Sequence, residues 1–165
     1  MPIPSPKGYS LTQIALHWLV AGLIALQFLL NEPMSDAWDV VEDGGSVGFD
    51  PLVAAHVFGG IAILALVLWR IGLRLTRGVP DLPLTDPAHM RLAAHLGHMG
   101  LYALMVAIPV SGAVAWFVGI ETAAEVHEVM TTLLLVLVAV HAAAAVWHQF
   151  WLKDGLLLRM KRPSD

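Results

Sequence analysis

The sequence predicts an all-α integral membrane protein, a four-helix bundle with both termini cytoplasmic, and three observations support this prediction. Of the 165 residues, 58% are hydrophobic and only 13% are charged, whereas a soluble domain carries roughly 25% charged residues. Four apolar stretches are each long enough to cross a bilayer, which takes about 20 residues. All nine lysines and arginines fall on one side of these stretches.

The predicted architecture is a single transmembrane domain over residues 1–165. Its helices are expected approximately over 10–31, 51–75, 91–118 and 126–152. Turn-forming and charged residues separate these stretches, and the segment 32–50, rich in Asp, Glu and Gly, is predicted as the longest loop. Pro109 lies inside the third stretch and is expected to kink that helix.

The distribution of charge predicts the orientation in the membrane. Positively charged residues gather in the cytoplasmic loops of membrane proteins. The basic residues are Lys7, Arg70, Arg74, Arg77, Arg91, Lys153, Arg159, Lys161 and Arg162. The loops after the first and third helices contain none of them but hold nine of the 13 acidic residues. We therefore expect a multi-pass protein of a bacterial inner membrane, with these two loops in the periplasm.

The residue types present limit the chemistry of the protein. There is no cysteine, which excludes disulfides, iron–sulfur clusters, thiolate-ligated haem and the attachment of c-type haem. The net charge of −4 argues against a nucleic-acid partner. Histidine remains as the ligand for a metal or cofactor. The eight histidines are His17, His56, His89, His95, His98, His127, His141 and His148.

The depth of the histidines predicts a haem site near the periplasmic side. An ionisable side chain inside a membrane span is energetically unfavourable and usually functional. His56 lies near the periplasmic end of the second helix and His127 near the periplasmic start of the fourth. Two imidazoles at one depth on two helices are what bis-histidine ligation of haem in a helical bundle requires.

The spacing of two histidines in the fourth helix predicts a second site. His127 and His141 are 14 residues apart, so they share nearly one helix face and are separated by a rise of about 21 Å. The fourth helix can therefore supply a ligand to each of two haems. The partner of His141 is left open by spacing, because His17 and the His95 and His98 pair lie in the same half of the membrane.

Two other interpretations of the histidines are weaker. A zinc site takes four ligands from Cys, His or carboxylate, and the sequence has no Cys and no zinc-binding helix motif such as H-E-x-x-H. A histidine-lined proton path without a cofactor is the second alternative. If the histidines line such a path, the protein would be a transporter or channel without a cofactor.

Several sequence elements together resemble the bacterial cytochrome b561 family. They are Ile14–Val20 with its His17-Trp18 pair, His56-Val57 with Gly60, Arg70 with Arg74, Ala94–His98, Pro109-Val110 with Gly112, His127-Glu128, the run His141–Ala145, His148, Lys153-Asp154 and Leu157–Met160. They extend over most of the chain. Within the family, the sequence is most similar to membrane-bound superoxide:ubiquinone oxidoreductases.

The resemblance implies which histidines pair. It implies that His17 and His141 hold a haem b on the cytoplasmic side, and that His56 and His127 hold a haem b on the periplasmic side. It also implies a ubiquinone site near the cytoplasmic end, where His148 follows His141 by two helical turns.

Two arginines complete the predicted cofactor-binding residues. Arg70 and Arg74 are expected to neutralise haem propionates, because a guanidinium matches a carboxylate in a bidentate way. The alternative role for both is the anchoring of the helix at the cytoplasmic surface.

The expected function is oxidoreduction across the membrane. Electrons from a periplasmic donor, with superoxide as the candidate, would pass through two haems to ubiquinone. The periplasmic loops are acidic and contain no basic residue, so their charge should repel the superoxide anion. The alternative is an electron-relay cytochrome b subunit that serves a separate dehydrogenase or hydrogenase and uses the acidic loop for docking.

Overall fold

A computed structural model describes residue 6 and residues 8–81 and 87–163. It contains five α-helices: α1 (Leu11–Leu29), α2 (Asn31–Glu42), α3 (Pro51–Arg77), α4 (Ala88–Val118) and α5 (Glu121–Trp147). A π-helix, η1 (His148–Leu152), continues α5, and a 3₁₀-helix, η2 (Leu156–Met160), follows it. The described part of the chain contains no β-strand, which confirms the all-α prediction.

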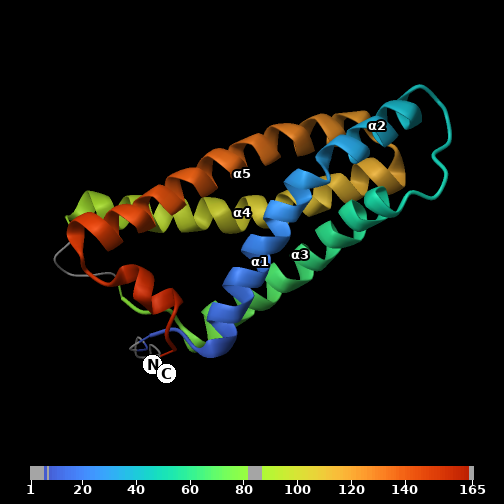
Figure 1. The fold of residues 1–165 in the computed structure, drawn as a ribbon. Coiled ribbons are helices and arrows are strands. Elements are labelled where there is room, and N and C mark those ends of the chain that lie inside the picture. Colours follow the sequence, from blue (N-terminus) through green and yellow to red (C-terminus); the bar gives the residue numbers. More distant parts are fainter. Residues whose placement is uncertain (1–5, 7, 82–86, 164–165) are drawn as a thin grey trace.

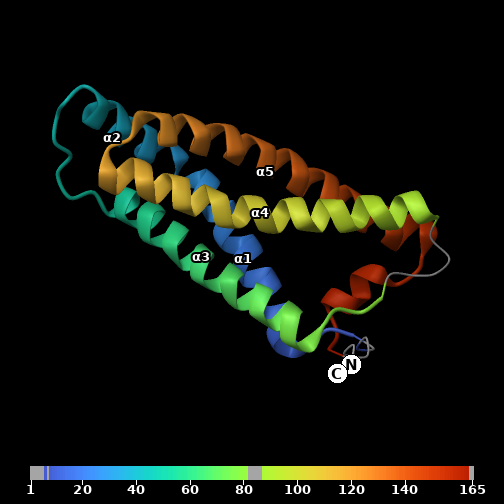
Figure 2. The same cartoon turned by 180° about the vertical axis from the view of Figure 1, so that it is seen from behind.

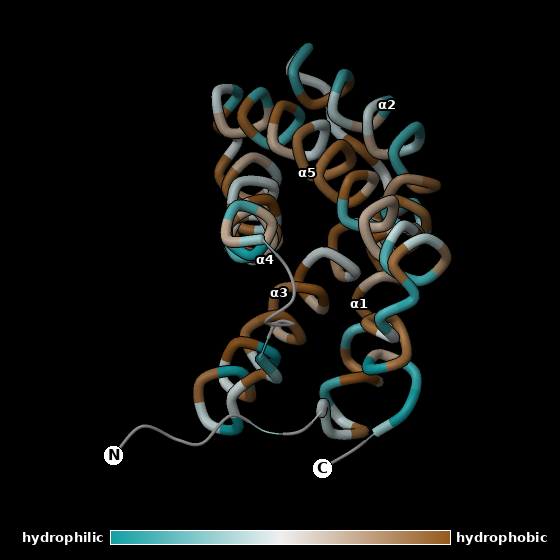
Figure 3. Tube along the Cα trace, turned by 90° about the vertical axis from the view of Figure 1, so that its left-hand side faces the viewer, coloured by the Kyte–Doolittle hydropathy of each residue, from teal (hydrophilic) through white to brown (hydrophobic). Residues whose placement is uncertain are grey.

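Within the described residues, four helices are long and apolar enough to cross a membrane. They are α1, α3, α4 and α5 together with η1. Figure 3 shows these helices coloured mainly as hydrophobic, whereas α2 is largely hydrophilic. Many large apolar side chains on the long helices face outwards, as expected for surfaces that contact lipid. The four predicted spans are thus present as helices.

The long helices pack in sequence around a small core. α3 packs against α1 and α4, and α4 packs against α5. The two pairs α1–α3 and α4–α5 approach each other near α2 and diverge toward the end where both termini lie (Figures 1 and 2). Below we call these two ends the α2 end and the terminal end. The core cluster consists of Val20, Ile63, Val67, Leu101, Met105, Ile108 and Leu134.

Local sequence determines where these helices begin and end. Ser10 and Gln13 form a capping box at the start of α1. The Asp50 side chain accepts a hydrogen bond from the Leu52 N–H, and Pro51 occupies the first turn of α3, where its missing N–H is harmless. Gly119 ends α4 with a φ of +74°, a left-handed conformation that glycine adopts without steric cost.

The segment predicted as a long loop contains a helix. α2 occupies Asn31–Glu42 and packs mainly against α3. Its Ala37 is buried, while its acidic side chains are exposed. Glu32 in its first turn also suits the positive end of the helix dipole. Only about residues 43–50 form the loop, so the prediction of a loop over 32–50 was wrong for most of that segment.

The fourth spanning helix differs from its predicted bounds at both ends. α5 begins at Glu121, before the predicted start at residue 126, because only Gly119 and Ile120 separate it from α4. Its α-helical geometry ends at Trp147, and the last predicted turn is a π-helix. A π-helix has i→i+5 hydrogen bonds and occurs frequently at functional sites.

Candidate functional site

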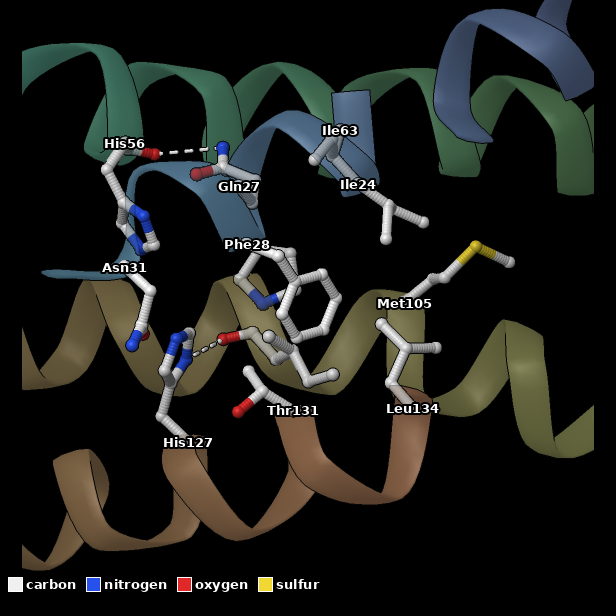
Figure 4. Close-up of a pocket in the computed structure, with 13 residues that line it drawn as sticks. Ile24, Gln27, Phe28, Asn31, His56, Ile63, Met105, His127, Thr131 and Leu134 are labelled. Carbon is white, nitrogen blue, oxygen red and sulfur yellow. Dashed lines mark hydrogen bonds between the residues drawn. The ribbon is translucent and has the colours of Figure 1, made fainter. Parts of the chain in front are cut away.

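Two histidines face each other at the α2 end of the bundle. His56 on α3 and His127 on α5 have ring centroids 6.4 Å apart with an angle of 66° between the ring planes. They line a pocket that contains about 620 Å³ of space free of atoms, part of it open to the surroundings (Figure 4). We call His56 and His127 the α2-side pair.

Helix α4 fixes the orientation of His127. The Nδ1–H of His127 donates a hydrogen bond to the Ile108 carbonyl, 2.8 Å away, so its Nε2 is free to bind a metal. The Ser111 hydroxyl donates to the same carbonyl. A Cβ atom at Gly112 would lie only 2.8 Å from the His127 ring, so a glycine is needed there for the ring to approach α4 this closely.

A second pair of histidines lies toward the terminal end. His17 on α1 and His141 on α5 also have ring centroids 6.4 Å apart, with an interplanar angle of 57°. The Arg70 guanidinium donates from Nη2 to the Nδ1 of His17 at 3.2 Å. Because an arginine only donates, His17 accepts through Nδ1 in this structure. We call these residues the terminus-side pair.

His98 is a third histidine beside the terminus-side pair. Its ring centroid is 5.3 Å from that of His141, and its Nδ1–H donates to the Ala94 carbonyl at 2.6 Å. His95 and His89 have exposed side chains. The structure therefore brings His17 and His98, but not His95, next to His141.

The spacing within the two named pairs fits bis-imidazole ligation of one metal ion. With a metal–nitrogen bond of about 2.0–2.1 Å, as zinc makes to imidazole, and about 1.1 Å from nitrogen to ring centre, two opposed imidazoles have centroids about 6.3 Å apart. Both pairs match this distance. His98 and His141 are too close together for it. Among the described residues, no group of three or more His, Cys, Asp or Glu could hold a metal ion, so the donor sets are pairs, as haem requires.

Two arginines carry positive charge beside the terminus-side pair. The guanidinium carbons of Arg70 and Arg74 lie 5.6 and 5.8 Å from the centre of the Tyr102 ring, within cation–π distance. Within the described part of the chain, neither guanidinium forms an ion pair. Two arginines without a counter-ion can bind an anionic group such as a carboxylate.

His148, predicted near a quinone site, begins the π-helix after α5. Its Nδ1–H donates to the Asp154 carboxylate at 2.5 Å. Slight burial would raise the pKa of Asp154, but hydrogen bonds from His148 and from the Leu156 N–H outweigh it and lower the pKa below its usual range. Asp154 is therefore an anion that orients the His148 ring and leaves Nε2 free.

Sequence reasoning assigned no role to three polar residues near these sites. Gln27 lines the α2-side pocket, Ser111 bonds the carbonyl that holds His127, and Asp154 holds His148. Gln27 had a detectable signal, since it is a polar residue within an uncharged span. Ser111 and Asp154 had weaker ones, because serine is common in membrane helices and Asp154 lies outside the spans.

The chain matches known proteins over nearly its whole length. The family model of prokaryotic cytochrome b561 matches residues 8–163. The chain belongs to the prokaryotic cytochrome b561 family. It is 40% identical over 159 residues to a cytochrome b562 of Cereibacter sphaeroides, with 94% of this chain and 96% of the relative covered.

Other relatives of this cytochrome b561 family member are more distant. A probable superoxide oxidase CybB of Yersinia pestis is 30% identical, with 93% and 96% of the two chains covered. A cytochrome b561 homologue of Escherichia coli is 27% identical, with 92% and 96% covered. Family membership and the four apolar helices indicate a bacterial membrane protein that transfers electrons through haem b.

Proposed function

We propose that this protein is a di-haem b-type cytochrome that passes electrons from a donor at the α2 end, through two haems, to ubiquinone at the terminal end. The observation that carries the proposal is the 6.4 Å centroid separation in both histidine pairs. In the proposed orientation, the α2 end faces the periplasm and both termini are in the cytoplasm of a bacterium, because none of the nine basic residues lies in the sequence segments 32–50 and 119–128 that connect the helices at the α2 end.

Each histidine pair would hold one haem b by its Nε2 atoms. His56 and His127 are the proposed ligands on the α2 side, and His17 and His141 those on the terminal side. Bound haem b supplies a one-electron redox centre, and the protein controls its position and environment. The Nδ1–H bond of His127 to the Ile108 carbonyl is the outer contact that orients such a ligand.

Binding at the terminal side requires Arg70 to move from its present contact. A histidine that binds iron through Nε2 carries its proton on Nδ1 and cannot accept a hydrogen bond there. The contact from Arg70 to His17 would therefore have to break, and the freed guanidinium could then, together with Arg74, pair with haem propionates. The absence of another ion-pair partner for either arginine among the described residues supports this role.

The pair His148–Asp154 is proposed to serve ubiquinone reduction. Conversion of ubiquinone to ubiquinol takes two electrons and two protons. Asp154 accepts the Nδ1–H of His148, which leaves Nε2 as the atom that can hold a proton for a quinone oxygen. The location of this pair beyond His141, at the cytoplasmic end of α5, lets those protons come from the cytoplasm.

Superoxide is the proposed donor, by similarity to the probable superoxide oxidase of Yersinia pestis. Two superoxide anions would give two electrons and leave as two molecules of O₂, while one ubiquinone takes those electrons and two protons. A second candidate function is an electron relay from a separate dehydrogenase or hydrogenase. The exposed acidic side chains of α2 favour it, because they suit a basic protein partner.

The proposed function is tested by haem counting and turnover of purified protein. Wild type is expected to contain two haem b per chain by pyridine haemochrome, and His56→Ala and His127→Ala to contain one. Superoxide should reduce the haems, and a short-chain ubiquinone should reoxidise them. A single haem in wild type would contradict the two-haem proposal. Two haems without superoxide-dependent reduction would support the relay function instead.

A further inference from the structure

The two ligands of the α2-side pair differ in their outer contacts. His127 donates its Nδ1–H to the Ile108 carbonyl. The Nδ1 of His56 is buried and has no hydrogen-bond partner in the described structure. Buried polar atoms are rarely without a partner, and an exception needs an explanation.

A second buried atom without a partner lies on a neighbouring residue. Gln27 on α1 donates from Nε2 to the main-chain carbonyl of His56 at 3.1 Å, while its Oε1 has no partner in the same described structure. Figure 4 shows the carboxamide of Gln27 beside His56, with its oxygen toward the imidazole. Within the described structure, a ring nitrogen that can carry a proton and an amide oxygen that can accept a hydrogen bond therefore lie without partners on two residues that already touch.

The bundle has space made for this glutamine. A Cβ atom at Gly59 on α3 would collide with Nε2 of Gln27. The glycine therefore lets the carboxamide lie against α3 next to His56. If the carboxamide only filled space, its buried Oε1 would have no hydrogen bond, which is energetically unfavourable. We therefore expect a hydrogen-bond donor to Oε1.

Ligation by His56 would supply that partner. A histidine that binds iron through Nε2 keeps its proton on Nδ1, and ligating histidines almost always donate this proton to an acceptor. Oε1 of Gln27 is an acceptor only. A His56 ligand would need an acceptor for its Nδ1–H, and the Oε1 of Gln27 is an acceptor without a donor in the described structure.

We propose that Gln27 is a positioning residue for the α2-side haem, whose Oε1 accepts the Nδ1–H of His56. The inference rests on the proposed function, since it assigns His56 to iron. The carboxamide then holds His56 both by its ring and by its main chain. The two proposed ligands would then have different acceptors: a side-chain amide for His56 and a main-chain carbonyl for His127. Gln27 sets the basicity of His56 and, through it, the reduction potential of this haem.

The test compares two glutamines of the same helix. Gln13 also lies on α1 and donates from Nε2 to a main-chain carbonyl, that of Gly78, at 3.2 Å. Gln27→Met and Gln13→Met thus each remove one hydrogen bond to a main-chain carbonyl outside α1. Haem content and a spectroscopic redox titration are measured for both purified proteins, and the wave missing in His56→Ala identifies the α2-side haem.

The expected result is specific to Gln27. Gln27→Met should weaken haem binding at the α2-side site by about 10–100-fold and raise the potential of the haem that remains, because a less basic ligand stabilises ferric iron less. The wave of the other haem should not move. Gln27→Glu keeps an acceptor, so it should retain the haem and lower its potential. Gln13→Met should leave both waves in place.

Three outcomes would overturn the inference. If the α2-side haem has the same content and the same reduction potential in Gln27→Met as in Gln13→Met, and wild type holds two haems, the role of Gln27 is contradicted and the proposed function is left intact. Loss of haem in Gln27→Glu as in Gln27→Met would contradict an acceptor role. Absence of a haem that depends on His56 and His127 in wild type would overturn both proposals.

Discussion

The intramembrane histidines differ in what their Nδ1 atoms contact. His127 and His98 donate to main-chain carbonyls, at 2.8 and 2.6 Å. His17 accepts from Arg70 at 3.2 Å, and His56 has no partner within the described structure. Since the proton on Nδ1 decides whether Nε2 is free to bind iron, His98 is as well prepared to be a ligand as His127.

This similarity predicts unequal effects of two histidine variants. His17→Ala should retain part of the terminus-side haem, because the free Nε2 of His98 lies near His141. The two ring centroids, 5.3 Å apart, need to separate by only about 1 Å for His98 to replace the lost ligand. His17→Ala combined with His98→Ala should lose that haem completely. Pyridine haemochrome counts and the shape of the reduced α-band measure both effects.

The control for this comparison is the other pair. His56→Ala should lose one full haem without rescue, since the described part of the chain places only the His56 ring beside His127. Complete loss of one haem in His17→Ala alone would show that His98 cannot act as a ligand.

A second prediction at this scale concerns His148. His148→Gln should keep both haems and slow quinone reduction by about 10²-fold, the lower range for loss of a general acid. Asp154→Asn should cause a smaller loss, because the ring would remain but its orientation would relax. Stopped-flow reoxidation of the reduced haems by a short-chain ubiquinone measures the rate. Haem reduction by the donor should be unchanged, and an unaltered reoxidation rate in His148→Gln would limit the residue to a structural role.

The sequence identifies these histidines as candidate ligands, but it does not predict which side chains they contact. The depth of His56 and His127 and the 14-residue spacing of His127 and His141 follow directly from the chain. The partner of His141 does not, because His17, His95 and His98 lie at comparable depth. Gln27 contacts His56, which is 29 positions away in the sequence, and Asp154 contacts His148, which is six positions away. No local sequence pattern predicts such contacts.

Helix α2 shows how an element can be missed when its composition resembles a loop. It has 12 residues, five of which are Asn, Pro, Ser or Asp, and these residue types favour turns. Its buried Ala37 and half-buried Trp38 form the narrow apolar side of the helix. Isolated helices of this length are marginal in water, so packing against α3 supplies the stability that local propensity does not.

The charge of α2 predicts a pH dependence of its docking. Loss of solvation first, and then a hydrogen bond with Glu121 and the negative charges of Glu121, Asp39 and Asp43, raise the pKa of Glu42. A glutamate with a raised pKa in the folded state stabilises that state below its ordinary pKa. This contribution is lost as the pH rises through the raised value. Docked α2 should therefore loosen as the pH rises above the ordinary pKa of a glutamate and through the raised pKa of Glu42.

Substitution of this glutamate tests the prediction. Glu42→Gln should remove the repulsion, protect α2 at neutral pH and flatten the pH profile. Hydrogen exchange of the α2 amides, corrected for the intrinsic rate at each pH, measures the effect. Glu32→Gln on the first turn of α2 is the control, and equal protection by both variants would contradict a specific role of Glu42.

At the scale of the whole molecule, the number and length of the membrane spans could be predicted from the sequence, but the arrangement of the helices could not. Four apolar helices and their lengths were predictable, because the bilayer requires about 20 apolar residues per span. The divergence of the α1–α3 and α4–α5 pairs toward the terminal end (Figures 1 and 2) was not. It depends on which helices contact each other, and the apolar pattern of a lipid-exposed helix does not distinguish neighbours from lipid.

The acidic end predicts how salt affects the reaction with superoxide. If superoxide is the donor, repulsion by exposed Glu32, Asp36 and Asp39 should slow its approach at low salt. The rate constant should rise as the Debye length falls from about 30 Å at 0.01 M salt to about 8 Å at 0.15 M. Pulse radiolysis or stopped-flow haem reduction measures it.

A charge-neutralised variant supplies the control for this experiment. Replacement of Asp36, Asp39, Glu42 and Asp43 by their amides should raise the rate at low salt and remove most of the salt dependence. A rate constant of wild type that falls with salt would contradict repulsion as the dominant field at this face.

The separation of 14 positions between His127 and His141 also has an energetic consequence for the cell. In the proposed orientation, an electron that passes between the two sites moves inward by about 21 Å, roughly two thirds of the hydrocarbon thickness of about 30 Å. Against an interior that is negative by 100 mV, that movement requires about 1.6 kcal/mol per electron, from about 2.3 kcal/mol for the full span. Each turnover would therefore charge the membrane, and an energised cell would oppose the same electron transfer that a de-energised one lets proceed.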